Sequence, residues 1–226
     1  MKKIISILVA LSIVLSFVWV CGEEGDTASV ITSDWAKESV QYGYELGIVK
    51  ENLQFTKPIS REKFCELIYN LVIKVNGMLA APPADNFTDV TNERILMLAG
   101  AGIINGKSET EFCPGDSLTR AEAATIIVRM INKFMPMEAT MMWYEFEDGD
   151  KIPLWASDSV QTICNLGFMK GVGDGEFAPD MAYTAEQAVA TLVRVYDSAV
   201  ELGLLGNSIN AGVIGGFDGL VEMPEE

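Results

Sequence analysis

Apolar residues recur along this chain at the three- and four-residue spacing of amphipathic helices. Phe64, Ile68, Leu71 and Val75 fall on one helical face. The same spacing predicts three further faces, formed by Ala36, Val40, Gly43 and Gly47, by Ile95, Leu98 and Gly102, and by Ala124, Ile127, Val128 and Ile131. None of these stripes can be hidden by its own helix, so the pattern predicts an all-α protein in which helices bury one another.

The helices come in three similar units. Each unit runs helix, glycine turn, loop, helix, and Gly47, Gly102 and Gly167 mark the three turns. A capping residue starts the second helix of each unit: Ser60, Thr119 or Thr184. The predicted boundaries are 29–76 for a divergent first repeat, 87–135 for the second and 145–199 for the third. Stacking the three units would join their apolar faces into one core.

The two ends of the chain differ from the repeats. Lys2 and Lys3 precede an uncharged run, Ile4 to Val20, which predicts a signal peptide over residues 1–22. An uncleaved anchor and lipidation of Cys21 remain alternatives. After residue 199 the helical period is lost and glycine becomes frequent, so residues 200–226 are predicted to form a Gly-rich acidic tail.

Charge narrows the range of partners. The chain has 16 Lys and Arg against 32 Asp and Glu, a formal charge of -16. Nucleic-acid binding requires a basic face, so we expect no nucleic acid as partner, and no membrane after signal removal. Any attraction to an anionic ligand must be local.

The sequence offers little for catalysis or for a metal. It has no histidine, and we expect no enzyme activity, no metal and no cofactor. The acidic cluster at 145–150 could bind calcium or form a solvated loop, and Cys65, Cys113 and Cys164 are expected to be free thiols. Met135, Met137, Met141 and Met142 could meet a protein partner or fill a gap between units.

The motif order in the second and third units has a known counterpart. "FTDV", "GIING" and "EFCPGDSLTRAEAA" in the second unit, with "GFMKGVGDGEFAPD" and "YTAEQA" in the third, closely resemble the S-layer homology module. The first unit, with "DWA", "LGIV" and "ISREKF", resembles it more weakly. The resemblance implies three modules in a pseudo-threefold spindle around a central three-helix bundle, with grooves between neighbours. It also implies binding of a secondary cell-wall polysaccharide, typically one with a pyruvate ketal on a mannosamine, by a secreted protein on a bacterial envelope.

The resemblance also implies a set of ligand-binding residues. The arginine of its T-R-A-E motif lies in the groove, and here it is Arg120, with Arg61 in the same place of the first unit. The remaining candidates are Glu122, Asn105, Gly106, Lys170, Gly171, Trp35 and Trp155. The tryptophans could cover sugar faces or pack into the core.

An arginine in the first turn of a helix is unfavourable by itself, because that end already carries partial positive charge. We therefore expect Arg61 and Arg120 to grip a ligand carboxylate together with free backbone N–H groups. The alternative is that these arginines extend into solvent or form ion pairs with nearby acidic side chains. Ala185 replaces the arginine in the third unit, so at most two grooves are expected to work.

Two functions stay open at this level. The first is non-enzymatic anchoring to the cell envelope through an anionic polysaccharide. The alternative is a secreted protein-interaction or assembly component whose repeats have lost sugar binding and whose Met-rich linker or tail meets a protein partner.

Overall fold

The computed structural model describes residues 30–84, 86–137 and 142–205, and those from Ile31 onward form one compact unit. Helices dominate this part, and it contains isolated bridges but no β-strand. The predicted signal peptide and nearly all of the predicted tail lie outside the described residues. The elements are η1 (Asp34–Ala36), α2 (Lys37–Glu45), α3 (Arg61–Asn76), α4 (Glu93–Gly100), α5 (Arg120–Phe134), η2 (Gly149–Lys151), α6 (Leu154–Asn165) and α7 (Ala185–Glu201).

The helices begin and end where the sequence predicts. The side chains of Ser60, Thr119 and Thr184 cap α3, α5 and α7, and the last two form complete capping boxes with Glu122 and Gln187. Gly47, Gly102 and Gly167 follow the short helices with φ of 72°, 73° and 75°. Glycine adopts that left-handed conformation without steric cost, so these residues end the helices.

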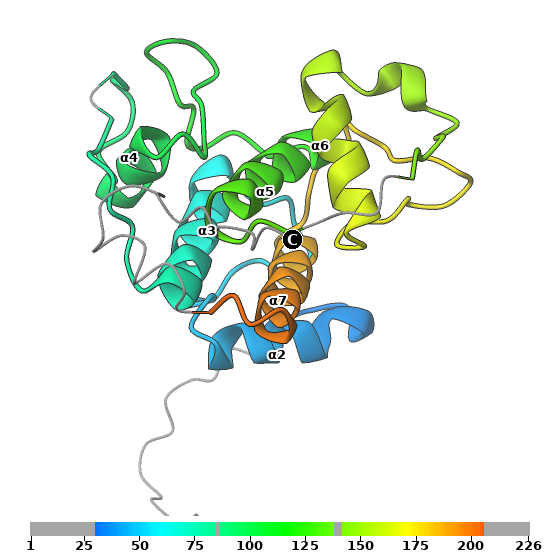
Figure 1. Ribbon diagram of the computed structural model, residues 1–226, viewed down its shortest axis with the longest axis horizontal. Coiled ribbons are helices and arrows are strands. Elements are labelled where there is room, and N and C mark those ends of the chain that lie inside the picture. Colours follow the sequence, from blue (N-terminus) through cyan, green and yellow to red (C-terminus); the bar gives the residue numbers. More distant parts are fainter. Residues whose placement is uncertain (1–29, 85, 138–141, 206–226) are drawn as a thin grey trace, which may run out of the picture. The chain divides into compact units, whose positions relative to one another are not determined.

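Long and short helices pair in a cyclic order. The long helix of each unit packs against the short helix of the next: α3 against α4, α5 against α6, and α7 against α2 of the first unit. Figure 1 shows α3 between α4 and the pair α5 and α7, and α3 contacts both of the other long helices. The first unit therefore participates in the same pattern as the other two.

A ring of three backbone hydrogen bonds joins the residues just before the long helices. The N–H of Ile59 donates to the carbonyl of Tyr183 at 2.8 Å, Tyr183 to Leu118 at 2.8 Å, and Leu118 to Ile59 at 3.0 Å. The first two N–H groups of each long helix continue this pattern by donating to loop carbonyls of a neighbouring unit. Their acceptors are Asp116 and Pro114 for α3, Met181 and Pro179 for α5, and Lys57 and Phe55 for α7.

All six α-helices contribute to the core. Each supplies at least one side chain that is essentially inaccessible to solvent: Val40, Ile68, Leu98, Ile127, Val160 and Leu192. These side chains belong to one buried cluster, so no unit has a separate core. The predicted stripes meet there, except that Gly47 and Gly102 end their helices outside the buried cluster. No helix in the described part of the chain is long and apolar enough to cross a membrane.

Two equivalent carboxylates fix the loops that precede α5 and α7. Asp89 accepts the N–H groups of Phe112 and Cys113 at 2.9 and 2.7 Å, and Asp148 accepts those of Phe177 and Ala178 at 2.8 Å each. Cys113 and Ala178 have positive φ, 59° and 56°, which non-glycine residues seldom adopt. The carboxylates therefore stabilise a strained turn at the same place in two units.

We expect Asp148→Asn to lower the free energy of unfolding by about 2 kcal/mol, because the amide accepts one of the two N–H groups and faces the other with its own NH₂. Urea unfolding measures the change. Asp150→Asn, an exposed neighbour, should change the free energy by less than about 0.5 kcal/mol. Equal effects of the two substitutions would contradict this role for Asp148.

The hydrogen bonds to Phe112 and Cys113 lower the pKa of Asp89. A carboxyl whose folded pKa lies below its unfolded value of about 3.9 stabilises the fold above that pH and loses the contribution as pH falls through the folded pKa. We therefore expect Asp89→Asn to reduce the difference in stability between pH 6 and pH 3. Thermal unfolding at both pH values tests this, and an unchanged difference would contradict it.

Candidate functional site

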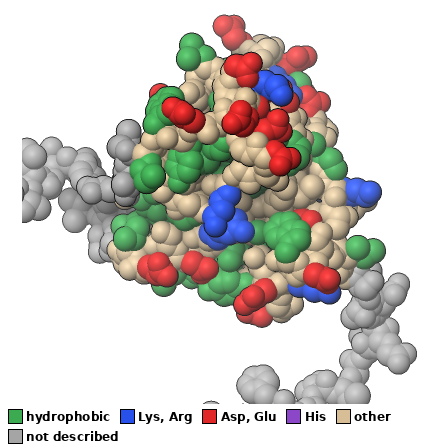
Figure 2. Space-filling model, turned by 90° about the vertical axis from the view of Figure 1, so that its right-hand side faces the viewer, with side chains coloured by type: hydrophobic (Ala, Val, Ile, Leu, Met, Phe, Trp, Pro, Cys, Tyr) green, Lys and Arg blue, Asp and Glu red, His purple; other side chains and the backbone are tan. Residues whose placement is uncertain are grey.

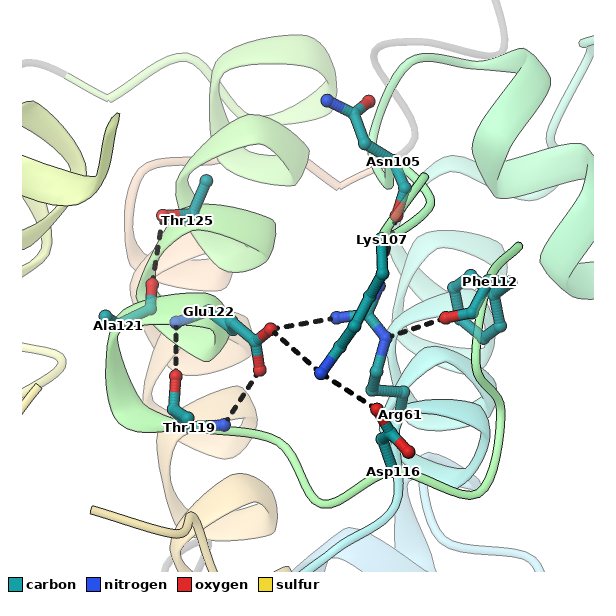
Figure 3. A network of polar contacts seen from close by, with 9 residues as sticks. All are labelled: Arg61, Asn105, Lys107, Phe112, Asp116, Thr119, Ala121, Glu122 and Thr125. Atoms are coloured by element: carbon teal, nitrogen blue, oxygen red, sulfur yellow. Dashed lines mark hydrogen bonds and ion pairs between the residues drawn. The ribbon is translucent and has the colours of Figure 1, made fainter. Parts of the chain in front are cut away.

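Arg61, the first residue of α3, is buried and reaches into the loop of the second unit. Its Nε donates to the carbonyl of Phe112 at 3.0 Å and its Nη2 to the carbonyl of Asn105 at 3.1 Å. The guanidinium lies 4.9 Å from the centroid of the Phe112 ring, and Nη1 is 3.4 Å from Oε1 of Glu122. Figure 3 shows this side chain crossing from α3 towards α5 and the loop between α4 and α5.

Arg120 repeats this arrangement one unit further along. Its Nε donates to the carbonyl of Phe177 at 2.9 Å, its Nη2 to that of Lys170 at 2.7 Å, and the guanidinium lies 4.8 Å from the Phe177 ring centroid. Burial lowers the pKa of Arg120 from its ordinary value, although an arginine stays charged under these conditions. Both arginines therefore bind the loop of the next unit through carbonyls and an aromatic face.

The expected carboxylate clamp at the helix ends is wrong in its detail. The first two N–H groups of α3 and α5 already donate to loop carbonyls of the neighbouring unit, so they are not free for a ligand. Arg61 and Arg120 are each only 5% exposed. The guanidinium is tolerated in the first turn because the loop carbonyls supply the negative partial charge that it needs, and because each of these turns also contains an acid, Glu62 or Glu122.

Arg61 nevertheless forms part of a groove. The groove has a volume of about 440 Å³, and we call it groove A; it is lined by Arg61, Asn105, Gly106, Lys107, Glu122, Thr125, Arg129 and Trp155. These residues come from all three units. Lys107, which also pairs with Asp116 at 2.9 Å, approaches Glu122 at 3.8 Å (Figure 3).

A second, smaller groove occupies the equivalent place one unit further. Groove B has a volume of about 150 Å³ and is lined by Trp35, Arg120, Phe168, Met169, Lys170, Tyr183, Gln187, Ala190, Thr191 and Arg194. The structure thus brings together Arg61, Asn105, Gly106, Glu122 and Trp155 in groove A, and Arg120, Lys170 and Trp35 in groove B.

The tryptophans are groove residues, and their alternative place in the core is wrong. Trp35 is 55% exposed and Trp155 is 58% exposed. Each stands twelve residues before the glycine that ends its short helix, so the equivalence was visible in the sequence. Each therefore presents much of its ring to solvent within a groove.

Sequence reasoning missed two arginines that line the grooves. Arg129 and Arg194 stand ten residues after the caps Thr119 and Thr184, at matching places in α5 and α7. Within the described residues Arg129 has no hydrogen bond or ion pair, whereas Arg194 donates to the carbonyl of Phe168 at 3.2 Å. Their recurrence at equal spacing from the caps was the signal that could have found them.

The remaining candidates have structural contacts. Glu122 accepts the N–H of Thr119 in the capping box and faces Arg61, so it balances charge in groove A. A side chain at Gly106 would overlap the carbonyl oxygen of Glu111, and one at Gly171 would lie 2.8 Å from that of Glu176. Gly171 is adjacent to Lys170 but is not among the residues that line groove B.

The third equivalent place differs in composition. Ala185 stands where the other units have arginine, Asn70 stands where they have Arg129 and Arg194, and Val90 stands where they have tryptophan. Lys63 there pairs with Glu51 at 2.7 Å and Glu66 at 3.0 Å. Lys63 is thus paired with two carboxylates, and these three side chains together carry a net negative charge.

The cysteines and the acidic loop offer no second site. Cys65, Cys113 and Cys164 are free, and burial raises the pKa of Cys65 to about 12 and of Cys164 to about 11, which disfavours the reactive thiolate. No cluster of three or more His, Cys, Asp or Glu suited to a metal ion occurs in the part of the chain that the structure describes. Asp148, from the predicted acidic cluster, instead accepts two backbone hydrogen bonds within the third unit.

The geometry defines a helical repeat protein whose successive repeats enclose basic, tryptophan-bearing grooves. Residues 86–124 and 145–188 match the family model of the S-layer homology domain. The two segments include most of the residues that line grooves A and B. The chain therefore contains two segments that match the S-layer homology domain, within the second and third of the predicted units.

Three relatives show where such segments occur. An endoglucanase of Bacillus sp. (strain KSM-635) is 33% identical over 94 residues, which cover 41% of this chain and 10% of the enzyme. The surface-layer 125 kDa protein of Lysinibacillus sphaericus is 30% identical over 131 residues, 58% of this chain and 11% of that protein. The S-layer protein EA1 of Bacillus anthracis is 26% identical over 125 residues, 55% of this chain and 13% of that protein.

These matches cover only about a tenth of each relative, and they fall in the region of the S-layer homology domains. The domain is a cell-wall-binding module and not a catalytic one, and it assigns this protein to the bacterial cell surface.

The structural role of Arg61 gives a testable consequence. Arg61→Ala leaves the carbonyls of Phe112 and Asn105 without their donor, so we expect a loss of about 2 to 4 kcal/mol in the free energy of unfolding. Arg129→Ala, which removes no internal hydrogen bond, should cost less than about 0.5 kcal/mol. Urea denaturation compares them. Comparable stability of Arg61→Ala and the natural sequence would contradict this role.

Proposed function

We propose that this protein is a non-catalytic anchor of the bacterial cell envelope, and that grooves A and B bind an anionic secondary cell-wall polysaccharide. One observation carries the proposal. Each groove gathers three basic side chains and one exposed tryptophan, in a chain with twice as many acids as bases. The bases are Arg61, Lys107 and Arg129 in groove A, and Arg120, Lys170 and Arg194 in groove B.

The basic groups of a groove differ in their tasks. Arg129 and Arg194 can each offer a pair of parallel N–H donors to a carboxylate of the polymer, the strongest geometry available to an arginine. Arg61 and Arg120 bind the loops that form the groove walls, and their buried positive charges add to the electrostatic potential inside the grooves. Their burial keeps that charge fixed and poorly screened.

Trp155 and Trp35 complete the recognition of a sugar. An exposed indole presents a flat apolar face against which the C–H face of a pyranose can lie. In groove A the hydroxyl of Thr125 and the amide of Asn105 lie within the same cavity and suit sugar hydroxyls. A volume of about 440 Å³ is in the usual range for a small-molecule site, whereas groove B falls below it and suits one acidic substituent.

Local charge explains how an acidic protein can attract an acidic polymer. Charges on the remaining surface are screened beyond about 8 Å at physiological ionic strength. A carboxylate inside groove B therefore experiences mainly the three bases around it, and one inside groove A experiences three bases of which Glu122 offsets part of the charge. A pyruvate ketal supplies such a carboxylate, and we include it in the proposal as the preferred acidic group.

The proposal includes the arrangement of the repeats. The cyclic pairing of α3 with α4, α5 with α6 and α7 with α2 supports a pseudo-threefold spindle in which residues 29–76 act as a third, divergent module. The place with Ala185, Asn70 and Val90 lacks both arginines and the tryptophan of grooves A and B and keeps only Lys50, at the position of Lys170, so we propose that two of the three grooves bind.

The direct test is sedimentation with isolated cell-wall sacculi, before and after chemical removal of the polysaccharide. A contact between a guanidinium and a carboxylate contributes about 1.5 to 3 kcal/mol, so Arg129→Ala combined with Arg194→Ala should weaken binding at least tenfold. Lys133→Ala, an exposed base one turn beyond Arg129 on α5, is the matched control and should bind normally.

Polymer-dependent sedimentation that the double substitution leaves unchanged would contradict the assignment of the grooves. Sedimentation that persists after removal of the polymer would favour the alternative, a component that meets a protein partner.

A further inference from the structure

The backbone of residues 142–144, which precede α6, is hydrogen-bonded to side chains of that helix. The side-chain amides of Gln161 and Asn165, one turn apart on α6, each form two hydrogen bonds with the backbone of a single residue. Gln161 accepts the N–H of Tyr144 at 2.8 Å and donates to its carbonyl at 2.9 Å. Asn165 accepts the N–H of Met142 at 3.0 Å and donates to its carbonyl at 2.8 Å. The two clamps are two residues apart, as in an extended strand, and they fix Trp143 between them.

The second repeat packs the equivalent segment directly on its helix. Counted from the glycine turns, Gln161 corresponds to Leu96 and Asn165 to Gly100. There the N–H of Ala84 donates to the carbonyl of Leu96 at 2.9 Å, and a Cβ at Gly100 would overlap the carbonyl oxygen of Pro82. The third repeat places two amide side chains between segment and helix, so the segment stands further from α6.

The space so made is a cavity of about 390 Å³, lined by Trp143, Tyr144, Glu145, Phe146, Gly149, Ile152, Ser157 and Gln161. We call Trp143, Tyr144 and Phe146 the aromatic platform. Trp143 is 72% exposed, and the Tyr144 ring lies nearly parallel to that of Phe146, at 14° with centroids 6.1 Å apart. Phe146 in turn packs on Phe177, the ring beneath Arg120, so the stacked pair Tyr144 and Phe146 is anchored to the core, and Trp143 adds a third, exposed ring to the cavity lining.

The chemistry of this cavity differs from that of grooves A and B. No basic side chain lines it, and Glu145 does. The cavity also offers hydrogen-bonding groups. The Gln161 amide has a second N–H that does not bond to Tyr144, and Ser157 supplies a hydroxyl. Figure 2 shows the side of the molecule that faces right in Figure 1, where exposed hydrophobic side chains lie among acidic ones.

We propose that this cavity is a further subsite for a neutral sugar residue of the same wall polysaccharide, stacked on the aromatic platform. The inference rests on the proposed function. The absence of a base and the presence of Glu145 disfavour an acidic sugar, whereas a rigid aromatic face with a spare amide N–H and a hydroxyl suits a neutral pyranose.

Continuity with groove A supports this occupant over a protein. Trp155 of groove A and Ser157 of the cavity both belong to the first turn of α6, but residues two apart face different sides of a helix, so a polymer chain that occupies both sites must bend around that turn. A chain with acidic and neutral residues would then place its acidic residue beside Arg129 and a neutral one on the platform. Groove A would then recognise an acidic sugar residue of the polymer, and the cavity a neutral one.

The test uses purified wall polysaccharide in two forms, native and with its carboxylates reduced to alcohols. We expect Trp143→Ala to weaken binding of both forms about tenfold, because the platform does not depend on charge. Arg129→Ala should weaken binding of the native polymer and leave the reduced form unaffected. Leu154→Ala, 93% exposed and outside the cavity lining, is the control for loss of an exposed apolar side chain and should bind both forms normally.

The outcomes separate the inference from the proposed function. If Trp143→Ala binds both forms as the natural sequence does while Arg129→Ala loses the native form, the neutral subsite is wrong and the anchoring function stands. If the natural sequence binds neither form of the polymer, both the neutral subsite and the anchoring function are wrong. If Trp143→Ala instead turns a dimer into a monomer in sedimentation velocity, the platform is an interface with a second copy and the sugar subsite is overturned.

Discussion

The structure depends on hydrogen bonds that cross from one repeat to the next at the start of each long helix. A helix leaves its first N–H groups without internal partners, and here the loop carbonyls of a neighbouring repeat accept two of them in α3, α5 and α7. The ring formed by Ile59, Leu118 and Tyr183 joins the three starts at one place. Each long helix therefore relies on another repeat for two of its backbone partners, which couples the folding of the repeats, and grooves A and B lie at their junctions.

Arg61 and Arg120 extend this same constraint to side chains. Each guanidinium satisfies two loop carbonyls and covers a phenylalanine ring of the adjacent repeat. A charge buried in this way is costly to remove and also fixes the walls of a groove. Stability and ligand recognition are consequently combined in one residue, and a loss of binding on its replacement cannot by itself show direct contact with a ligand. Arg129 and Arg194, which lie in the grooves and bear less on the fold, separate the two effects.

The helices, their caps and the glycine turns could be predicted from the sequence, because period and capping are local properties of Phe64 to Val75 or of Thr119 and Glu122. The resemblance of the motifs also named Arg61, Arg120, Asn105 and Lys170 as groove residues, without predicting which of them share a groove. It could not show that the carbonyls of Phe112 and Phe177 occupy the guanidinium groups, because those contacts join residues more than 50 positions apart. The exposure of Trp35 and Trp155 likewise depends on packing between repeats, so local pattern left it open.

The central claim is that an acidic polysaccharide meets the exposed guanidinium groups of grooves A and B. The chain has five arginines, and Arg94, which stacks on Tyr69 outside both grooves, is an internal reference. The most direct measurement follows the arginine Nε–H signals by nuclear magnetic resonance while purified wall polysaccharide is added. The account predicts that the signals of Arg129 and Arg194 shift with saturation while that of Arg94 stays in place. Equal shifts of all five signals, or a shift of Arg94 alone, would contradict it.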